Sequence, residues 1–378
     1  MPKIVLTHVT KQWGKFIGVN DMNLEIDDGA FVTLLGSSGC GKTTTLRMIA
    51  GLETPTRGEI RFDDRIVFSS EKNINVPPAR REVGFLFQNY ALWPHMTVTQ
   101  NIAFGLETMK WKKSDISARV REMLQTLRIE QFAERYPAEL SGGQQQRVAI
   151  ARTLAPKPRV LFMDEPLSNL DAKLRGEMRT ELKRLHRDTG STFVYVTHDQ
   201  LEAMTLSSRI CMMNEGVLQQ YAPPLEVYNR PANLFVADFV GNPSMNIIPA
   251  RAQKTGPASA LIRFLGIEAA FSAEKVFDVG SGVVSVGIRP EFLPISDSGD
   301  IEGLAYSTLP AGMETTVRIK RGDTILSSVV FGAIDYETDA KIRFSVAGSN
   351  ILLFDRASGK NIACGSMTVR ESKRTEEK

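Results

Sequence analysis

The fold of this chain is decided by one stretch, Phe31-Val32-Thr33-Leu34-Leu35-Gly36-Ser37-Ser38-Gly39-Cys40-Gly41-Lys42-Thr43. An apolar run of β-forming residues ends in a glycine-rich loop, and a helical pattern begins directly after it. The spacing is that of a phosphate-binding loop in its required context of strand, loop and helix. Glycines let successive backbone N–H groups surround a polyphosphate, and the helix adds its positive N-terminal end. The stretch therefore predicts a nucleoside triphosphate site.

Two side chains of this loop have distinct predicted tasks. Lys42 is expected to reach the β- and γ-phosphates, and the hydroxyl of Thr43 is expected to bind Mg²⁺. The alternative is an ordinary glycine-rich turn, which the combination of motif and context disfavours. The predicted nucleotide-binding residues of the loop are Gly36, Ser37, Ser38, Gly39, Cys40, Gly41, Lys42, Thr43 and Thr44.

Length and composition indicate a globular protein of two or three domains. The chain has 378 residues, of which 42% are hydrophobic and 24% charged. A net charge of +3 is too small to indicate nucleic acid as a partner. Three scattered cysteines show no disulfide or metal spacing, which fits a reducing cytoplasm. No stretch approaches the roughly 18–20 apolar residues that span a bilayer, so any membrane-spanning part is expected in another subunit.

A pair of carboxylates ends a second buried strand. Residues 160–163 form a short apolar run, as expected of a strand buried on both faces, and Asp164 and Glu165 follow directly. Adjacent carboxylates in such a place are costly unless cations or phosphate chemistry offset them. The next predicted strand, residues 192–196, leads to His198, although a lone histidine at a strand end is usually structural.

Three further features are ambiguous by themselves. Trp13 could stack on a purine or be an edge-strand tryptophan. The sequence Leu140-Ser141-Gly142-Gly143-Gln144 opens a helix and could bind an anion or form an ordinary turn. Gln88 ends an apolar strand, and the run Asn89–Met96 after it could be a docking surface or cover the local core.

The pattern along the chain predicts two domains. Residues 1–240 read as α/β, with a helical subdomain at about 89–158, and Gly241 to Ser244 form the predicted boundary. Residues 241–378 contain short β-type runs with turn residues between them, which favour a small β-barrel or two half-domains. Residues 370–378 are expected to form a charged, frayed tail.

Taken together, these motifs resemble the ATP-binding cassette family of transporter ATPases over residues 1 to about 240. The order of the motifs, and above all the combination of phosphate loop, LSGGQ and Asp-Glu after an apolar run, carries the resemblance. It implies an α/β P-loop NTPase domain with a helical subdomain, followed by an OB-like, all-β regulatory domain. The elements that match are Trp13, Gly36–Thr43, Gln88, Leu140–Gln144, Val160–Glu165, Ser168–Asp171 and His198.

The resemblance implies a role for each of these residues. Trp13 would stack on adenine, and Glu165 would act as general base on the attacking water, with His198 on the γ-phosphate. Mg²⁺ would be held by Thr43, Gln88 and Asp164, directly or through water. Two copies of the chain would enclose two ATP molecules, each site being completed by Ser141, Gly143 and Gln144 of the opposite copy. Residues 168–171 would lie at the seam of this homodimer.

Two strings narrow the resemblance to importers. Phe239-Val240-Gly241-Asn242-Pro243-Ser244-Met245-Asn246 and Gly287-Ile288-Arg289-Pro290-Glu291 look like the maltose-type carbohydrate importers, which also serve glycerol phosphate. The implied protein is the ATPase of a bacterial importer, peripheral at the cytoplasmic face of the inner membrane. Its partners would be two permease subunits docking near Asn89–Met96 and, indirectly, a solute-binding protein, with no nucleic acid involved.

Other functions stay open at the level of the sequence. A polyamine, sulfate or ferric-ion importer would share the same layout. A soluble cassette ATPase acting on ribosomes or DNA usually has paired cassettes or basic patches, which this chain lacks. A purely binding, regulatory module fits poorly with intact Glu165 and His198, and a P-loop kinase has no use for the LSGGQ element.

Overall fold

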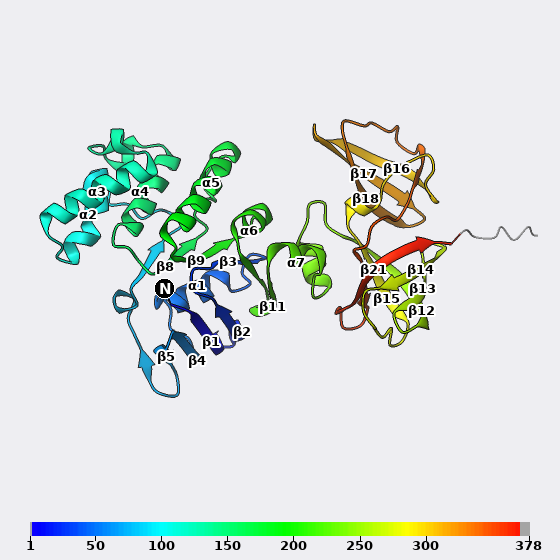
Figure 1. Ribbon diagram of the computed structural model, residues 1–378, viewed down its shortest axis with the longest axis horizontal. Coiled ribbons are helices and arrows are strands. Elements are labelled where there is room, and N and C mark those ends of the chain that lie inside the picture. Colours follow the sequence, from blue (N-terminus) through cyan, green and yellow to red (C-terminus); the bar gives the residue numbers. More distant parts are fainter. Residues whose placement is uncertain (1, 371–378) are drawn as a thin grey trace, which may run out of the picture. The chain divides into compact units, whose positions relative to one another are not determined.

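The computed structural model describes residues 2–370, whose contacts divide the chain into two compact units that part between Pro224 and Leu225 (Figure 1). The first unit contains two sheets and the helices around them. The second contains a closed barrel, a further sheet and two short helices. Each unit has its own hydrophobic core.

The centre of the first unit is a six-stranded sheet in the order β11-β10-β3-β9-β8-β7. Every neighbouring pair is parallel except β10 and β11, which form an antiparallel hairpin at one edge. Parallel strands need crossovers, which here are helices or long connections that cover the sheet. The strands are β3 (Phe31–Gly36), β7 (Val83–Leu86), β8 (Val160–Asp164), β9 (Thr192–Thr197), β10 (Arg209–Asn214) and β11 (Val217–Ala222).

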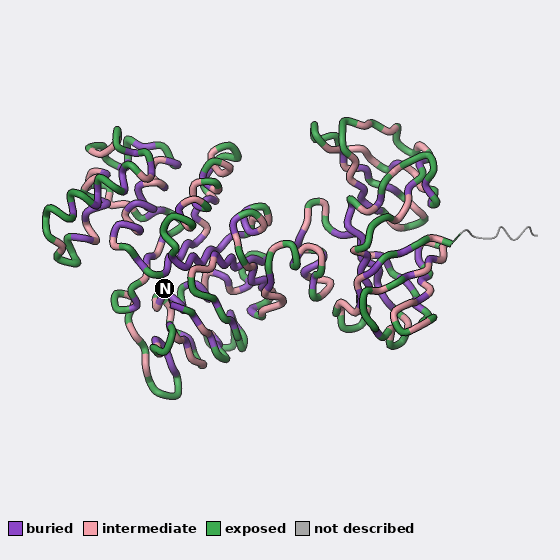
Figure 2. Tube along the Cα trace, in the orientation of Figure 1, coloured by how far each residue is buried: buried purple, intermediate pink, exposed green. Residues whose placement is uncertain are grey.

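The strands β3, β8 and β9 in the middle of this sheet are buried on both faces (Figure 2). Because side chains alternate along a strand, Val160 and Phe162 of β8 join one core while Leu161 and Met163 join the other. Val160 and Phe162 pack with α1 (Lys42–Ala50) and the antiparallel sheet that is described next, whereas Leu161 and Met163 pack with the helices of residues 98–189. A continuous apolar run in the sequence is therefore what this position requires.

The remaining elements of the first unit frame the central sheet. An antiparallel sheet has the order β2-β1-β4-β5-β6. It consists of β1 (Ile4–Trp13), β2 (Phe16–Ile26), β4 (Arg57–Phe62), β5 (Arg65–Ser69) and β6 (Ile74–Asn75). The helices are α2 (Val98–Thr108), α3 (Lys113–Leu127), α4 (Gly142–Leu154), α5 (Ala172–Thr189) and α6 (Gln200–Leu206), with 3₁₀ turns at Pro78–Arg80, Glu130–Phe132 and Pro137–Glu139.

The second unit is built almost entirely from strands. Six of them close a barrel in the order β12-β13-β14-β21-β20-β15, and four form a sheet in the order β18-β17-β16-β19. The barrel strands are β12 (Asn246–Gly256), β13 (Ser259–Phe264), β14 (Ile267–Ala273), β15 (Val283–Ile288), β20 (Ile351–Asp355) and β21 (Asn361–Val369). The sheet strands are β16 (Ile301–Pro310), β17 (Glu314–Arg321), β18 (Thr324–Phe331) and β19 (Lys341–Phe344), and a 3₁₀ turn lies at Pro290–Phe292.

The barrel and the four-stranded sheet are joined by a buried asparagine. Asn246 donates from Nδ2 to the carbonyls of Ile288 (3.1 Å) and Ser327 (2.8 Å), and its Oδ1 accepts from the Ser327 N–H at 2.7 Å. The two sheets also share one apolar core. The predicted order of an α/β domain followed by a β-rich domain is thus confirmed, and the β-rich domain is a six-stranded barrel with an added sheet.

Two short helices belong to the second unit and not to the first. The sequence placed its boundary at residues 240 and 241, after α7 (Pro224–Asn229) and α8 (Leu234–Phe239), whereas the contacts divide the chain directly after the first residue of α7. The buried guanidinium of Arg289 accounts for this difference. It donates to the carbonyls of Tyr228 (2.7 Å), Ala237 (3.2 Å) and Val240, and it stacks on the Tyr228 ring.

Candidate active site

The predicted site residues meet at one edge of the central sheet. In a parallel sheet the carboxyl ends of all strands lie on the same edge, where ligands of α/β proteins bind. Here β3 leads into the phosphate loop, β8 into Glu165, β9 into His198, and β7 toward Gln88. Four stretches separated by up to about 160 positions are thereby brought together (Figure 1).

The phosphate loop adopts the backbone that its glycines allow. Gly41, the N-cap of α1, has φ of 97°, in the left-handed region that favours glycine. A Cβ there would also lie 2.4 Å from the Gly18 carbonyl oxygen, so the position excludes every larger residue. The first N–H groups of α1 therefore face the loop without a side chain in the way. Thr44 lies half-buried in that first turn.

Lys42 carries a buried charge that has only neutral partners. Its side chain is 5% exposed, and Nζ donates to the carbonyls of Gly36 (2.9 Å) and Ser37 (2.8 Å). Among residues 2–370, none of the ion pairs includes Lys42. A buried ammonium without an anion is costly, and a phosphate in the loop would supply that anion. Burial raises the pKa of the neighbouring Cys40 thiol, which keeps this thiol neutral beside Lys42.

Asp164 and Thr43 form an oxygen pair beside the loop. The Thr43 hydroxyl donates to Oδ1 of Asp164 at 2.8 Å, and Arg47 forms an ion pair with Oδ2 at 3.3 Å. Asp164 is 4% exposed, so these contacts satisfy a carboxylate that water barely reaches. The sequence analysis missed Arg47, although its place four residues after Thr43 on the same helix face was a usable signal.

Glu165, His198 and Gln88 form a second cluster next to this pair. Nδ1 of His198 lies 3.3 Å from Oε2 of Glu165, and Nε2 of Gln88 lies 3.5 Å from the same oxygen. Glu165 has φ of 45°, a left-handed backbone that is strained for a non-glycine residue. Its N–H donates to Val196 of β9 and its carbonyl accepts from Ser168 at 2.9 Å, which holds that backbone.

Trp13 lies beside the phosphate loop and is partly exposed. A Cβ on Gly18 would lie 2.4 Å from the Trp13 ring, and the Gly18 carbonyl in turn meets Gly41 of the loop. The ring is 43% exposed, stacks on Phe16 at 6.2 Å between centroids, and has Lys11 above it. An exposed aromatic face next to a phosphate loop is suited to stacking on a base.

The residues of the LSGGQ stretch lie apart from this cluster. Ser141 is the N-cap of α4, and its N–H donates to Oε1 of Gln144 at 2.9 Å. Gly143 packs so closely on Leu174 of α5 that a Cβ would lie 2.4 Å from that side chain. Within residues 2–370, none of the hydrogen bonds of these residues reaches the phosphate loop. The structure therefore brings all predicted site residues of one chain together except Ser141, Gly143 and Gln144.

A buried acidic network supports the strand that carries His198. Glu202, 3% exposed, accepts from the Tyr195 and Thr197 hydroxyls, each at 2.7 Å. Burial raises the pKa of Glu202, and burial also raises the pKa of Tyr195 well above its ordinary value. Asp199 caps α6 through the N–H groups of Leu201 and Glu202. The sequence analysis missed this network, because nothing in the spacing of these residues distinguishes it from a helix cap.

The run Asn89–Met96 borders an apolar groove. Asn101, fully buried, exchanges hydrogen bonds with both backbone groups of Trp93 and donates to the Met96 carbonyl, which fixes this run. Arg152 stacks on Trp93 and donates to the carbonyls of Tyr90 and Ala91. The groove has a volume of about 470 Å³ and is lined mainly by Phe85, Phe87, Ala91, Trp93, Phe104 and Pro156.

None of the described helices is both long and apolar enough to cross a membrane. A cluster of three or more His, Cys, Asp or Glu side chains that could hold a metal is likewise absent from residues 2–370.

Comparisons with known proteins agree on one family. The sequence profile described as ABC transporter matches residues 19–168. The sn-glycerol-3-phosphate import ATP-binding protein of Ruegeria sp. is 41% identical over 96% of this chain and 100% of its own length. The trehalose/maltose import ATP-binding protein of Thermococcus litoralis is 55% identical over 68% of this chain and 69% of its own. The maltose/maltodextrin import ATP-binding protein of Salmonella typhimurium is 45% identical over 85% of this chain and 86% of its own.

A solved structure resembles the first unit. It is a dimeric, post-hydrolysis state of an ATP-binding cassette bound to ADP and Pi, with a TM-score of 0.51 and 33% sequence identity. The match covers 58% of this chain and 98% of that one. The share matched corresponds to a cassette without the second unit.

Proposed function

The chain belongs to the ATP-binding cassette family of transporter ATPases, and we propose that it is the ATP-hydrolysing subunit of a bacterial carbohydrate importer. The observation that carries the ATPase assignment is the buried Lys42 ammonium, which has only neutral partners in a loop shaped for phosphate. ATP supplies the anion that this charge lacks.

The residues around that loop divide the work of phosphoryl transfer. Lys42 and the N–H groups of residues 39–43 bind the phosphates, while Trp13 stacks on adenine. Glu165 accepts a proton from the attacking water, and His198, 3.3 Å from it, helps orient that water toward the γ-phosphate. Gln88 contacts the same carboxylate through its side-chain amide. This reaction depends mainly on positioning and charge, which fixed side chains supply.

The oxygen pair of Thr43 and Asp164 fits Mg²⁺. Hydroxyl and carboxylate oxygens 2.8 Å apart are hard donors, and Mg²⁺ in NTPases needs few protein ligands besides water and phosphate. Gln88 is the third proposed ligand, directly or through water. When bound, the ion would neutralise charge on the phosphates.

The separation of Ser141, Gly143 and Gln144 from the loop supports a homodimer. A helix N-terminus with two glycines can bind phosphate, but in one chain this one has no phosphate loop near it. A second copy placed head to tail would bring each LSGGQ stretch to the other copy's ATP, with residues 168–171 at the seam. The dimeric cassette with ADP and Pi offers a precedent for such an assembly.

The apolar groove beside Asn89–Met96 is the proposed docking place for a permease. Aromatic side chains line it, and its volume of about 470 Å³ suits the apolar face of a short helix. Two permease subunits would hold the dimer at the cytoplasmic face of the inner membrane as a peripheral part, with a solute-binding protein delivering cargo. The import relatives support this arrangement.

The cargo class rests on those same relatives, which are import proteins for maltose, trehalose and glycerol phosphate. The first experiment compares uptake by cells carrying wild type or Glu165→Gln, with labelled sugars, sugar alcohols, glycerol phosphate, a polyamine and sulfate. Selective loss of carbohydrate or glycerol phosphate uptake is expected. Loss of polyamine or sulfate uptake instead would keep the ATPase and overturn the cargo.

A further inference from the structure

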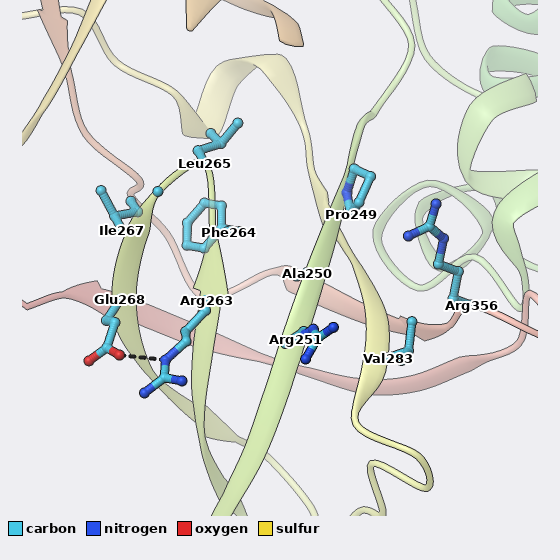
Figure 3. A pocket seen from close by; sticks show the side chains of 11 residues that line it. Pro249, Ala250, Arg251, Arg263, Phe264, Leu265, Ile267, Glu268, Val283 and Arg356 are labelled. Carbon is cyan, nitrogen blue, oxygen red and sulfur yellow. Dashed lines mark hydrogen bonds and ion pairs between the residues drawn. The ribbon is translucent and has the colours of Figure 1, made fainter. Parts of the chain in front are cut away.

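The outer face of the barrel carries an arginine groove, which we define by Arg251, Arg263 and Arg356 together with Glu268 and Val283 (Figure 3). The groove has a volume of about 610 Å³, within the usual range for small-molecule sites. It belongs entirely to the second unit and contains none of the residues assigned to ATP hydrolysis.

The charges of the arginine groove lie in one rung across neighbouring strands. Glu268 pairs with Arg263, Arg263 with Arg251, and Arg251 with Val283 in the register of the barrel. The N–H of Arg356 donates to the Val283 carbonyl at 3.4 Å, which extends the same rung. Like charges directly opposite each other on adjacent strands destabilise a sheet, so the pairing of Arg251 with Arg263 calls for a compensating anion.

The protein supplies only part of that compensation. Nε of Arg263 lies 2.5 Å from Glu268, which neutralises one guanidinium. Within residues 2–370, neither Arg251 nor Arg356 has an acidic side chain within ion-pair distance. The two flank Val283, whose side chain is 40% exposed, and adjacent strands are about 4.8 Å apart. Both guanidiniums can therefore reach an anion held above Val283.

The surroundings of Arg251 favour an organic ligand over a bare anion. Pro249 and Ile267 give the groove apolar walls. Past Arg251 the hollow continues for about another 340 Å³, where Gln253 and Ser281 offer an amide and a hydroxyl. Arginine pairs bind phosphate through parallel hydrogen bonds, and amide and hydroxyl groups bind hydroxyls.

From this arrangement we infer that the arginine groove binds a phosphorylated sugar or polyol. Its phosphate lies between Arg251 and Arg356, and its hydroxyls face Gln253 and Ser281. This site lies beyond the proposed ATPase function and places a second, small-molecule ligand on the all-β unit.

The test is calorimetric titration of the full-length protein. Saturating ADP and Mg²⁺ first fill the phosphate loop, so that a phosphate ester cannot bind there. Glucose 6-phosphate and glycerol 3-phosphate are then titrated, with glucose, inorganic phosphate and a short single-stranded oligonucleotide for comparison. We expect at least one of the two esters to bind, inorganic phosphate to bind more weakly, and glucose not to bind.

Three variants make the assignment specific. Arg251→Ala and Arg356→Ala should each weaken ester binding about tenfold or more, since each removes a charge-assisted contact. Arg318→Ala, which removes an exposed arginine from β17, is the matched control and should leave binding within about twofold of wild type, as expected without a direct contact.

Four results would overturn the inference. They are no binding of either ester, equal weakening by the Arg318 control, inorganic phosphate binding as tightly as the esters, and tighter binding of the oligonucleotide. None of these depends on ATP hydrolysis, so failure of this inference is distinguishable from failure of the proposed function.

Discussion

The nucleotide site of the first unit and the arginine groove of the second are built in opposite ways. The nucleotide site collects whole sequence motifs, because each follows the carboxyl end of a strand in one parallel sheet. The groove collects single residues from separate strands, because the register of an antiparallel barrel places them in one rung. Contiguous motifs can be recognised in a sequence, whereas a rung exists only once strands are paired.

The largest expected effect is the loss of ATP hydrolysis in the first unit, with the second unit unchanged. Glu165→Gln should lower kcat for ATP about 10²–10⁴-fold, the usual contribution of a general base. ATP binding should persist, so closed dimers should accumulate. Steady-state phosphate release and sedimentation with ATP measure these two results.

Glu177→Gln is the matched control for that variant. It makes the same chemical change at an exposed position on α5 and should keep wild-type turnover. Normal turnover of Glu165→Gln would place the general base elsewhere, and normal second-unit stability in both variants would keep the two regions distinct.

The next effect is on the stability of the second unit. Arg289→Ala removes a charged donor from three carbonyls, two of them buried, and should lower the free energy of unfolding of this unit by about 2–4 kcal/mol. Calorimetry should show two unfolding transitions. Binding of ADP should raise the midpoint temperature of the transition that comes from the first unit. Arg289→Ala should lower the midpoint temperature of the other transition, which comes from the second unit and which ADP leaves unchanged.

Arg289→Lys tests the geometry of these contacts. It keeps the charge but loses the planar fork, so it should recover only part of the lost stability. A single transition that both ADP and Arg289→Ala move would mean that the two units unfold together.

A smaller effect concerns nucleotide affinity. Trp13→Ala removes the exposed ring beside the phosphate loop and should weaken ATP binding by about 1–3 kcal/mol, or roughly 5- to 150-fold. Trp13→Phe should keep most of the affinity, because a smaller ring still stacks. Equilibrium titration of Mg-ATP measures both, and equal affinity of Trp13→Ala and wild type would leave adenine without this partner.

The smallest effect tests local stability in the first unit. Thr97 caps α2: its hydroxyl accepts from the Gln100 N–H at 3.3 Å, and its own N–H donates to the Gln100 side chain at 2.8 Å. Thr97→Ala should cost about 0.5–2 kcal/mol. The midpoint temperature of the ADP-sensitive transition should fall, and that of the other transition should stay unchanged.

Thr180→Ala serves as the control, since Thr180 lies exposed within α5 and alanine favours a helix interior. The free energy of unfolding of the first unit in this variant should stay within about 0.5 kcal/mol of the wild-type value. A larger loss there than at Thr97 would show that this helix cap contributes nothing specific.

The sequence was most informative where a function needs a backbone of fixed shape. The phosphate loop requires left-handed glycine at residue 41, and Asp164-Glu165 requires a buried strand before it, so both motifs predicted a family that the comparisons confirmed. It was less informative about contacts between side chains distant in sequence. Glu202 accepts hydrogen bonds from Tyr195 and Thr197, and the residues next to Glu202 in the sequence do not predict these contacts.

The sequence by itself determined the cassette fold, the phosphate loop and the carboxylates beside it, because each is a local pattern with a local physical cause. Only the tertiary structure decided that α7 and α8 pack with the β domain, because that depends on where the buried Arg289 finds its carbonyl partners. It also decided that Arg251 and Arg356, 105 positions apart in the chain, flank one exposed valine. Strand register, which no short stretch encodes, placed them there.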